Sequence, residues 1–594
     1  MKRIGVFVCH CGINIADTVD VDRVAEEIRE YPGVAYAVEY KYMCSDPGQN
    51  LIKEAIREHN LDGVVVAACS PTMHETTFRK TTASEGLNPY QCEIANIREQ
   101  CSWVHQEVQA EATAKAVEII KTIVEKVRYD ESLVPLTLPL IKRAMVIGGG
   151  VAGLQAALDI ADAGYPVILV EKEARLGGHV AQLSGTYLNF DAAPDMLASM
   201  IERVEEHPRI QVLTEAEVQE AGGYVGNFTV QVSQRGDGST GQQEESLVDS
   251  SPSDLQSPIS HLQSLSFDVG AIVVATGYEL YSKKRLGEYG GGKYPDVIDG
   301  LQFERMLASD GPTGGEIRRP SDGQVPQEVV FVQCAGSRDP EEHKPYCSKV
   351  CCMYVAKQAI MYKQRVPQGQ AYVFYIDIRS QGKGYEEFVQ RAMEDYDVLY
   401  LRGKVSKVFG EDSKVVVWGV DTLTGTPLEV DADLVVLATA TVPSAGAKDL
   451  AQCLRLSVDE HGFFSEAHPK LRPVESLTAG IFLAGAGQFP KDIPETIAQA
   501  SGAAAKVLQL FSQREMVQEP TIAHVNEELC SGCGLCVAAC PYEARTMHLW
   551  RPIAEVNQAL CQGCSACVAV CPNKACSVHN FDTAQVLAMV DVLF

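Results

Sequence analysis

Residues 144–153 read AMVIGGGVAG, a short apolar strand pattern that runs directly into a turn of glycines. The apolar stretch 154–161 continues as a helix pattern, and a second strand pattern, 166–170, ends at Glu171. A strand, a glycine turn and a helix in this order are typical of a dinucleotide-binding βαβ unit. Glycines let the backbone approach the pyrophosphate at the helix N-terminus, and the acidic residue accepts hydrogen bonds from ribose hydroxyls. The stretch therefore predicts an α/β fold with a dinucleotide site.

Further elements of the same kind favour FAD over NAD as the dinucleotide. RLGGH at 175–179 follows the acidic residue, ATG at 275–277 ends another strand pattern, and a glycine-rich segment at 480–487 ends a third. These elements are similar to those of flavoproteins with two dinucleotide-binding domains. Glycines that serve only turns and packing are the alternative. The predicted FAD-binding residues are Gly148, Gly150, Val151, Ala152, Gly153, Glu171, Lys172, Gly177, Gly178, His179, Ala275, Thr276, Gly277, Gly485 and Gln488.

Two cysteine runs near the C-terminus repeat one spacing, C-x-x-C-x-x-C-x-x-x-C-P. In two-cluster bacterial ferredoxins, such a run gives three thiolates to one cubane iron–sulfur cluster and the fourth to its neighbour. Zinc is the alternative, but zinc sites need neither eight cysteines nor a proline after each fourth one. The spacing predicts one [4Fe-4S] cluster on Cys530, Cys533, Cys536 and Cys571, and another on Cys561, Cys564, Cys567 and Cys540.

A third group of cysteines lies where such flavoproteins usually bind NAD(P)H. The strand pattern 328–332 runs into Cys334 instead of a second glycine turn, and Cys347, Cys351 and Cys352 follow on a predicted helix. Three thiolates from one helix and a fourth from a strand end can hold another cubane cluster. Cysteines that only fill a core are the alternative.

The composition of the chain narrows its class and its partners. The chain has 594 residues, a hydrophobic fraction of 46% and a formal net charge of −27, so several domains are expected. A field of this sign repels nucleic acid and anionic lipid, and neither is expected as a partner. No apolar run is long enough to span a membrane, and the first residues lead into a strand pattern rather than a secretory signal. The sequence therefore predicts a cytoplasmic protein whose 20 cysteines are reduced thiols.

Motifs along nearly the whole chain carry a family resemblance: VCHCG at 8–12, CSDPG at 44–48, ACSP at 68–71, YCSKVCC at 346–352, HPKLRP at 468–473 and PKDIP at 490–494. Together with the terminal cysteine repeats, they resemble the heterodisulfide reductase A-subunit family of iron–sulfur flavoproteins. The resemblance implies FAD and several [4Fe-4S] clusters. It also implies a thioredoxin-reductase-like flavoprotein with two dinucleotide domains, an N-terminal α/β domain and a C-terminal ferredoxin domain.

The resemblance also implies roles for individual residues. Lys357 and Glu304 fall on positions beside the flavin and are the predicted catalytic residues. Lys357 can stabilise a reduced, anionic flavin, and a solvated helix lysine is the alternative. A further cluster in the N-terminal domain is implied by cysteines that match those of the family: Cys9, Cys11, Cys44 and Cys69.

Domain boundaries follow from these motifs. Residues 133–140 are predicted to be a linker, and the Ser- and Gln-rich stretch 234–263 a flexible insert. The predicted domains are an N-terminal α/β domain at 1–135, a first FAD segment at 136–295, a pyridine-nucleotide-like domain that carries a cluster at 296–428, a second FAD segment at 429–516, and the two-cluster ferredoxin domain at 517–594.

Two departures from the family bear on the function. Many members carry an inserted ferredoxin unit where this chain has the cysteine-free stretch 234–263, and a C-x-x-C pair in the segment that reads NFDAAP at 189–194. The predicted function is flavin-based electron bifurcation between a low-potential acceptor and a disulfide-reducing partner subunit. An electron relay without energetic splitting and an NAD(P)H-dependent reductase are the alternatives. The implied partners are heterodisulfide-reductase-type B and C subunits, an electron-donating dehydrogenase or hydrogenase subunit, ferredoxin, and a second copy of this chain.

Overall fold

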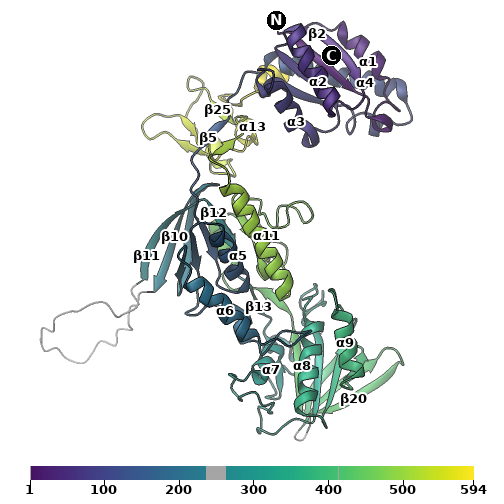
Figure 1. Ribbon diagram of the computed structural model, residues 1–594, viewed down its shortest axis with the longest axis vertical. Coiled ribbons are helices and arrows are strands. Elements are labelled where there is room, and N and C mark those ends of the chain that lie inside the picture. The colour runs from purple at the N-terminus through teal and green to yellow at the C-terminus, as the bar shows by residue number, and fades with distance from the viewer. Residues whose placement is uncertain (1, 236–261, 412–413, 594) are drawn as a thin grey trace, which may run out of the picture. The chain divides into compact units, whose positions relative to one another are not determined.

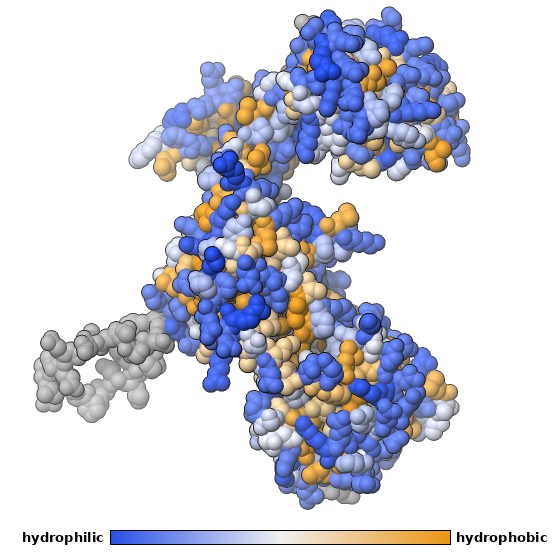
Figure 2. Space-filling model, in the orientation of Figure 1, coloured by the Kyte–Doolittle hydropathy of each residue, from blue (hydrophilic) through white to orange (hydrophobic). Residues whose placement is uncertain are grey.

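The computed structural model describes residues 2–235, 262–411 and 414–593 (Figure 1). They form two compact units: unit 1 combines Met1–Leu138 with Glu515–Phe594, and unit 2 is Pro139–Arg514. Most of the predicted flexible insert, 236–261, lies outside the described residues. No helix in the described part of the chain is long and apolar enough to cross a bilayer. The face shown in Figure 2 is largely hydrophilic, with apolar side chains in small patches.

Unit 1 begins with a parallel sheet covered by helices on both faces. Its elements are β1 Ile4–Cys9, β2 Val34–Tyr40, β3 Gly63–Ala68, β4 Cys92–Asn96, α1 Val21–Arg29, α2 Asp46–His59, α3 Pro71–Ala83 and α4 Gln109–Tyr129. The strand order is β2-β1-β3-β4, and β1 and β3 are buried at every residue, as their unbroken apolar sequences predict for central strands. α1 and α4 pack on one face of the sheet, and α2 and α3 on the other.

The C-terminal part of unit 1 consists of short strands and helices. They are β24 Met516–Gln518, β25 Ala523–Val525, β26 Arg545–Met547, β27 Ala554–Val556, β28 Cys576–Val578, α12 Leu535–Ala538, α13 Ala566–Ala569 and α14 Thr583–Asp591. β25 pairs with β28 and β26 with β27, both antiparallel. Gln585 of α14 donates a hydrogen bond to Asp130, the C-cap of α4, at 2.8 Å. This contact joins the two sequence segments of unit 1.

The segment predicted to be a linker, 133–140, contains a strand, so that prediction was incomplete. β5, Leu136–Leu138, pairs antiparallel with β24, nearly 380 residues later in the chain. The three-residue strand has too few residues to show an alternating pattern, and its partner is remote in sequence. The chain therefore leaves unit 1 and returns to it through one two-stranded ribbon.

Unit 2 contains a first parallel sheet in the order β23-β12-β6-β7-β8. Its strands are β6 Ala144–Ile147, β7 Val167–Val170, β8 Ile210–Leu213, β12 Ala271–Val274 and β23 Ile481–Leu483. One face is covered by the helices α5 Val151–Asp162, α6 Ala193–Glu205 and α11 Ile493–Phe511. The other face is covered by α10 Ala447–Leu454 and an antiparallel sheet of β9 Ala216–Tyr224, β10 Asn227–Arg235 and β11 Leu262–Val269.

A second parallel sheet of unit 2 repeats this plan in the order β14-β21-β15-β16-β17. Its strands are β14 Val297–Asp299, β15 Glu328–Ala335, β16 Gln370–Tyr375, β17 Leu399–Arg402 and β21 Leu434–Thr439. α7 Gly300–Leu307, α8 Cys351–Arg365 and α9 Tyr385–Glu394 cover one face. Antiparallel β18 Val405–Glu411, β19 Lys414–Asp421 and β20 Thr426–Ala432 cover the other. Two connecting strands, β13 Tyr278–Leu280 and β22 Thr441–Pro443, pair antiparallel, and the unit contains two domains of dinucleotide-binding type.

Candidate cofactor sites

The predicted glycine turn joins β6 to α5 at the carboxyl edge of the first sheet of unit 2. Gly148 has a φ of 111°, and a Cβ there would lie 2.4 Å from the carbonyl oxygen of Ala275, so a larger residue does not fit. A Cβ on Gly153 would lie 1.8 Å from the oxygen of Gly148, so this glycine holds α5 against the turn. Gly150 is the N-cap of α5 and has no capping side chain, which leaves the first N–H groups of the helix available to an anion.

Glu171 follows β7 and lies beside this turn. Its carboxylate accepts hydrogen bonds from the backbone N–H groups of Gly149, at 2.6 Å, and Glu173, at 2.8 Å. The residue is 7% exposed. Two backbone donors therefore fix the carboxylate at the strand end where a dinucleotide presents its ribose hydroxyls.

A cavity of about 1070 Å³ opens at this edge of the sheet. Pockets for small ligands span about 300–1,000 Å³, so this one has room for a full dinucleotide. The predicted residues that line it are Gly148, Gly150, Val151, Ala152, Glu171, Lys172, Gly177, Gly178, His179, Ala275, Thr276 and Gly277, together with Glu304 and Lys357. Gly153, Gly485 and Gln488 do not line it. Gly485 packs on Ala152 behind the wall, and the Gln488 amide donates a hydrogen bond to Glu466 at 2.7 Å.

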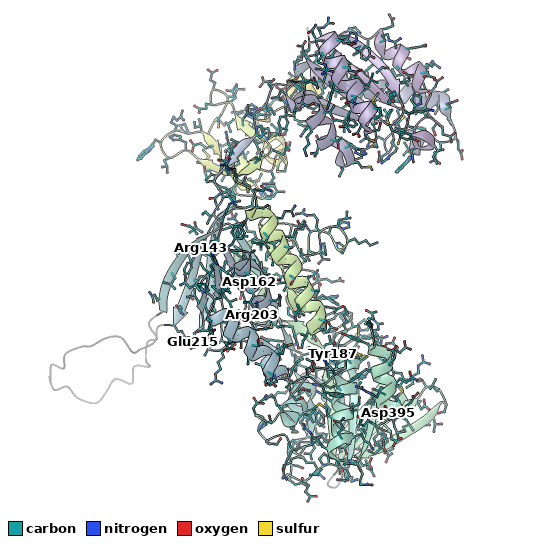
Figure 3. All side chains as sticks on the ribbon, in the orientation of Figure 1. Arg143, Asp162, Tyr187, Arg203, Glu215 and Asp395 are labelled. Atoms are coloured by element: carbon teal, nitrogen blue, oxygen red, sulfur yellow. The ribbon has the colours of Figure 1, made fainter. Side chains whose placement is uncertain are left out.

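Segments far along the chain add cavity residues to which the sequence patterns gave no site role, although Lys491 and Asp492 belong to the PKDIP motif. Asp492, the N-cap of α11, accepts hydrogen bonds from the hydroxyls of Tyr187 (labelled in Figure 3), at 3.0 Å, and Tyr385, at 2.5 Å. Lys491 also lines the cavity, and burial lowers its pKa to about 8. An Asp before Ile-Pro and an apolar helix is a helix-start signal, and it could have placed α11.

Lys357 and Glu304 form a buried ion pair in the cavity wall, each 2% exposed. The Lys357 ammonium also donates to the carbonyl oxygen of Gly185 at 2.7 Å. The Glu304 carboxylate accepts from the Ser184 backbone N–H, at 2.8 Å, and from the Gln358 amide, at 3.0 Å. Burial by itself raises the pKa of Glu304, but the Lys357 charge and these hydrogen bonds outweigh it and lower the pKa. Burial lowers the pKa of Lys357.

Three central cysteines gather where β15 ends and α8 begins. Cys334 adopts a φ of 57° at an irregularity in the register of β15, which turns the chain out of the strand. Cys351 and Cys352 are the first residues of α8. The Cys351 thiol lies close enough to Cys334 and Cys352 to interact with both, and its interaction lowers the pKa of Cys334. The three sulfurs therefore lie together, as a shared cluster requires.

The fourth central cysteine, Cys347, was expected on the same helix, and the structure corrects this expectation. α8 begins at Cys351, because Lys349 adopts a left-handed conformation with a φ of 64° and interrupts the helix. Cys347 lines a second cavity of about 300 Å³. Val350 and Asp492 line both this cavity and the large one. The loop thus places Cys347 at a cavity that shares lining residues with the large one.

α8 connects the central cysteines with the large cavity. Tyr354 and Lys357 line that cavity, one turn and two turns after Cys351. The rise of an α-helix places Lys357 about 9 Å along the axis from Cys351. One helix therefore carries both the cysteine Cys351 and the cavity residues Tyr354 and Lys357.

The terminal cysteines separate into the two sets that the spacing predicts. Two small cavities lie among these cysteines. Three cysteines of one run and the fourth of the other line each cavity: Cys530, Cys533, Cys536 and Cys571 in one, and Cys561, Cys564, Cys567 and Cys540 in the other. Cys533 and Cys564 are exposed. The four predicted thiols of each cavity match the ligand set of a [4Fe-4S] cluster, and Cys576 is a fifth thiol that lines the first cavity.

The N-terminal cysteines lie at the carboxyl edge of the first sheet in unit 1. Cys9 ends β1, Cys69 follows β3, and Cys44 precedes α2. Cys11 has a φ of 41° and lies near enough to Cys9 and Cys69 for their charges to interact, as does Cys44 to Cys9. Burial raises the pKa of Cys9 to about 11. The structure therefore brings the four predicted cysteines to one edge of the sheet.

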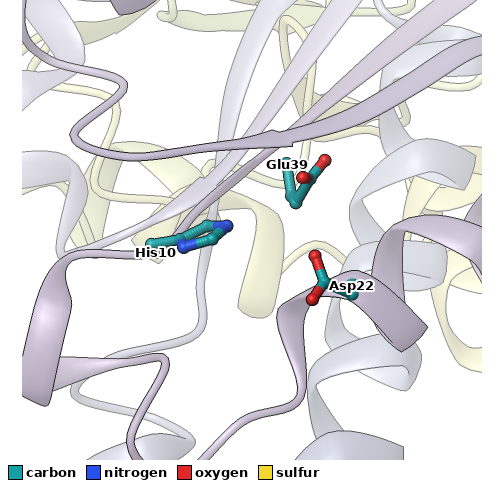
Figure 4. Close-up of side chains that lie close together, drawn as sticks. All are labelled: His10, Asp22 and Glu39. Atoms are coloured by element: carbon teal, nitrogen blue, oxygen red, sulfur yellow. The ribbon is translucent and has the colours of Figure 1, made fainter.

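His10, between Cys9 and Cys11, belongs to a separate group with Asp22 and Glu39 (Figure 4). One ligand atom from each of these three residues lies within 4.8 Å of the others. His10 Nε2 has no hydrogen-bond partner among the residues described. Asp22 is exposed, so water can satisfy its carboxylate, and we assign no ion to this group.

Comparison with known proteins agrees with two of these sites. The FAD binding domain family matches residues 143–229, and the 4Fe-4S dicluster domain family matches residues 529–575. The predicted FAD and [4Fe-4S] cofactors and the predicted α/β flavoprotein fold with a terminal ferredoxin domain are thereby confirmed. Among solved structures, thioredoxin reductase of T. acidophilum is similar with a TM-score of 0.40 and 15% identity, over 62% of this chain and 98% of its own.

Relatives match almost the full length of the chain. An iron-sulfur A-type subunit of the CoB-CoM heterodisulfide reductase of Methanopyrus kandleri is 43% identical, over 91% of this chain and 90% of its own. The A-type subunit of the H(2):CoB-CoM heterodisulfide,ferredoxin reductase of Methanothermobacter marburgensis is 41% identical with the same coverage, 91% and 90%.

Proposed function

The chain belongs to the heterodisulfide reductase A-subunit family, and from this premise we propose that it splits electron pairs between two acceptors within a heterodisulfide-reductase-type complex. It is an oxidoreductase that depends on FAD and iron–sulfur clusters. Bound FAD supplies the chemistry, since it accepts two electrons together and releases them one at a time. In the proposal, one electron goes to a partner subunit that reduces the disulfide, and the other goes to a low-potential acceptor.

The observation that supports this proposal is the course of α8. The helix begins with Cys351 and Cys352 and places Tyr354 and Lys357 in the cavity wall within the next two turns. Since the helix is rigid, the distance from the central cysteines to the cavity is fixed. Electron transfer between them needs no moving carrier.

Two buried, charged side chains of the cavity wall can stabilise a negative charge on a bound ligand. We propose that Lys357 provides a buried positive charge that favours a negatively charged ligand ring, and that Glu304 holds this ammonium in place. The proposed dinucleotide contacts are the α5 N-terminus for the pyrophosphate and Glu171 for the ribose.

The proposal includes four [4Fe-4S] clusters: two on the terminal cysteines, one on the central cysteines and one on the N-terminal cysteines. It also includes the predicted domain boundaries, a cytoplasmic location, B- and C-type partner subunits, a dehydrogenase or hydrogenase donor, and a second copy of the chain. Ferredoxin is the proposed low-potential acceptor, because the Methanothermobacter marburgensis relative is named as part of a heterodisulfide,ferredoxin reductase.

The test uses the complex purified without oxygen, an electron donor, ferredoxin and the CoB-CoM heterodisulfide named for the relatives. Ferredoxin reduction is followed by absorbance with and without the disulfide. We expect ferredoxin to be reduced only while the disulfide is also reduced, in equal electron amounts. Disulfide reduction without ferredoxin reduction would instead support a simple relay, which the cysteine-free stretch 234–263 favours.

A further inference from the structure

The two cavities of the terminal cysteines come from two repeats of one pattern, and they differ at an equivalent buried position. After the proline of the first run, residues 542–545 read YEAR, and after that of the second run, residues 573–576 read NKAC. Arg545 and Cys576 therefore occupy matching places, and each begins a short strand, β26 or β28. Arg545 is 3% exposed and Cys576 is 5% exposed.

Arg545 contacts only one of the two cysteine sets by a hydrogen bond. It lines the cavity of the second run, and its Nη2 donates to the Sγ of Cys567 at 3.0 Å. Its Nη1 is buried and has no hydrogen-bond partner in the part of the chain that the structure describes. Among the cysteines, the charge of this guanidinium interacts most strongly with Cys567, and less with Cys576 and Cys536 of the other cavity.

A buried cation needs a negative neighbour to balance the loss of hydration. Within the described residues, no carboxylate forms an ion pair with Arg545. Its charge interacts with cysteine thiols instead. Cluster-bound thiolates are therefore the negative group that can balance its charge. The unpartnered Nη1 is a further donor for a sulfur in the same cavity. The guanidinium therefore fits a site that holds an iron–sulfur cluster.

Cys576 lines the other cavity, with Cys530, Cys533 and Cys571, and brings no positive charge there. Each cavity has one exposed cysteine, Cys533 or Cys564, at the equivalent position, but the first cysteine of the run is half-buried in one case, Cys530, and buried in the other, Cys561. The difference in charge between the repeats is a guanidinium in one and a thiol in the other.

Net charge and hydrogen bonds to sulfur are among the factors that set the reduction potential of an iron–sulfur cluster. Reduction adds one negative charge, so a nearby cation stabilises the reduced form, and the low dielectric of a buried site strengthens the effect. An N–H donor on a ligand sulfur acts in the same direction, since it favours the more negative state.

We propose that Arg545 makes the two terminal clusters unequal, so that the cluster held by Cys540, Cys561, Cys564 and Cys567 has the higher potential. The first electron to enter this part of unit 1 rests on that cluster, and electrons flow toward it from the cluster of Cys530, Cys533, Cys536 and Cys571. The inference rests on the proposed [4Fe-4S] function, and it adds a direction of electron flow that the ligands alone do not give.

The test is a redox titration of the full-length holoprotein without oxygen, followed by electron paramagnetic resonance. Signals lost in Cys533→Ala and Cys564→Ala assign the two terminal clusters. In the unmodified protein we expect the Cys564 cluster to be reduced first, by at least a tenfold difference in the reduction equilibrium, which equals 59 mV for a one-electron couple. Equal potentials, or the reverse order, would overturn the proposal without any variant.

Variants of Arg545 then test the effect of its positive charge on the two potentials. Arg545→Gln keeps a polar side chain and removes the cation, and we expect it to lower the potential of the Cys564 cluster by at least tenfold in the equilibrium while the other cluster moves less. Arg545→Lys restores a cation and should recover part of the shift. Cys576→Ala is the matched control and should leave the order unchanged. Iron and acid-labile sulfide per chain report loading, so failure of the proposed clusters is distinguishable from failure of this inference.

Discussion

The two parallel sheets of unit 2 share one plan but differ at the end of one strand. In the first sheet, β6 runs into Gly148, and α5 starts after a short glycine turn. In the second, Cys334 is the penultimate residue of β15, and α8 starts after a loop that carries Cys347. The helices pack on their sheets in the same way. A dinucleotide-type domain can therefore exchange backbone donors for thiols without losing its core.

The largest expected effect comes from removing a thiol of the second sheet. Cys351→Ala should lose one cluster, about four iron atoms per chain, while it keeps FAD. Iron, sulfide and flavin per chain are measured together. Cys453→Ala, which changes a half-buried cysteine outside every predicted set, should lose none. Full iron content in Cys351→Ala would show that this thiol of the second sheet does not hold a cluster.

The next effect concerns the buried ion pair between α7 and α8, two helices of the second sheet that reach the cavity. Lys357→Met leaves the carboxylate of Glu304 buried without its cation and should lower the free energy of unfolding by about 3–5 kcal/mol. Urea unfolding measures this change. The double variant Lys357→Met/Glu304→Gln should regain much of the loss, because it removes both charges. A double variant as unstable as the single one would show that packing, not charge, causes the loss.

A smaller effect is expected at the glycine turn of the first sheet. Gly153→Ala places a Cβ 1.8 Å from the Gly148 oxygen, so α5 must shift, at about 1–3 kcal/mol. Flavin content should fall at least tenfold, and iron content should not. Gly222→Ala is the control, since a Cβ there meets nothing within 4 Å. Unchanged flavin in Gly153→Ala would mean that the first sheet does not bind FAD through this turn.

The smallest effect is expected at an exposed ion pair of the first sheet. Arg203 and Asp162, both labelled in Figure 3, lie 3.1 Å apart with side chains 58% and 54% exposed. Arg203→Ala should change the free energy of unfolding by about 0.2–1 kcal/mol, because water screens the pair. The change should shrink further in high salt, and a loss comparable to that of Lys357→Met would contradict this difference between buried and exposed charges.

The first sheet was predictable because its signals are local: a strand, glycines and a helix follow one another at 144–161. The grouping of the terminal cysteines was predictable because the spacing itself assigns the fourth ligand to the other run. The motif PKDIP contains Asp492, but its place in the cavity beside Tyr385 was not predicted, since the two residues meet only when remote helices come together. Lys349 was misread because residue type does not reveal a left-handed lysine. Arg545 went unnoticed because the cysteine pattern treats its position as variable.

The ribbon of β5 and β24 has a consequence for biosynthesis. The ribosome finishes β5 and then adds roughly 380 residues before β24 emerges, which takes roughly 20–75 s at common elongation rates. During this time the nascent N-terminal sheet lacks α14, and β5 lacks its partner β24. Unit 2 can fold first, and the C-terminal tail, Glu515–Phe594, then completes unit 1. The eight cysteines of the two terminal runs emerge only with this tail, so iron delivery to them is a late event in maturation.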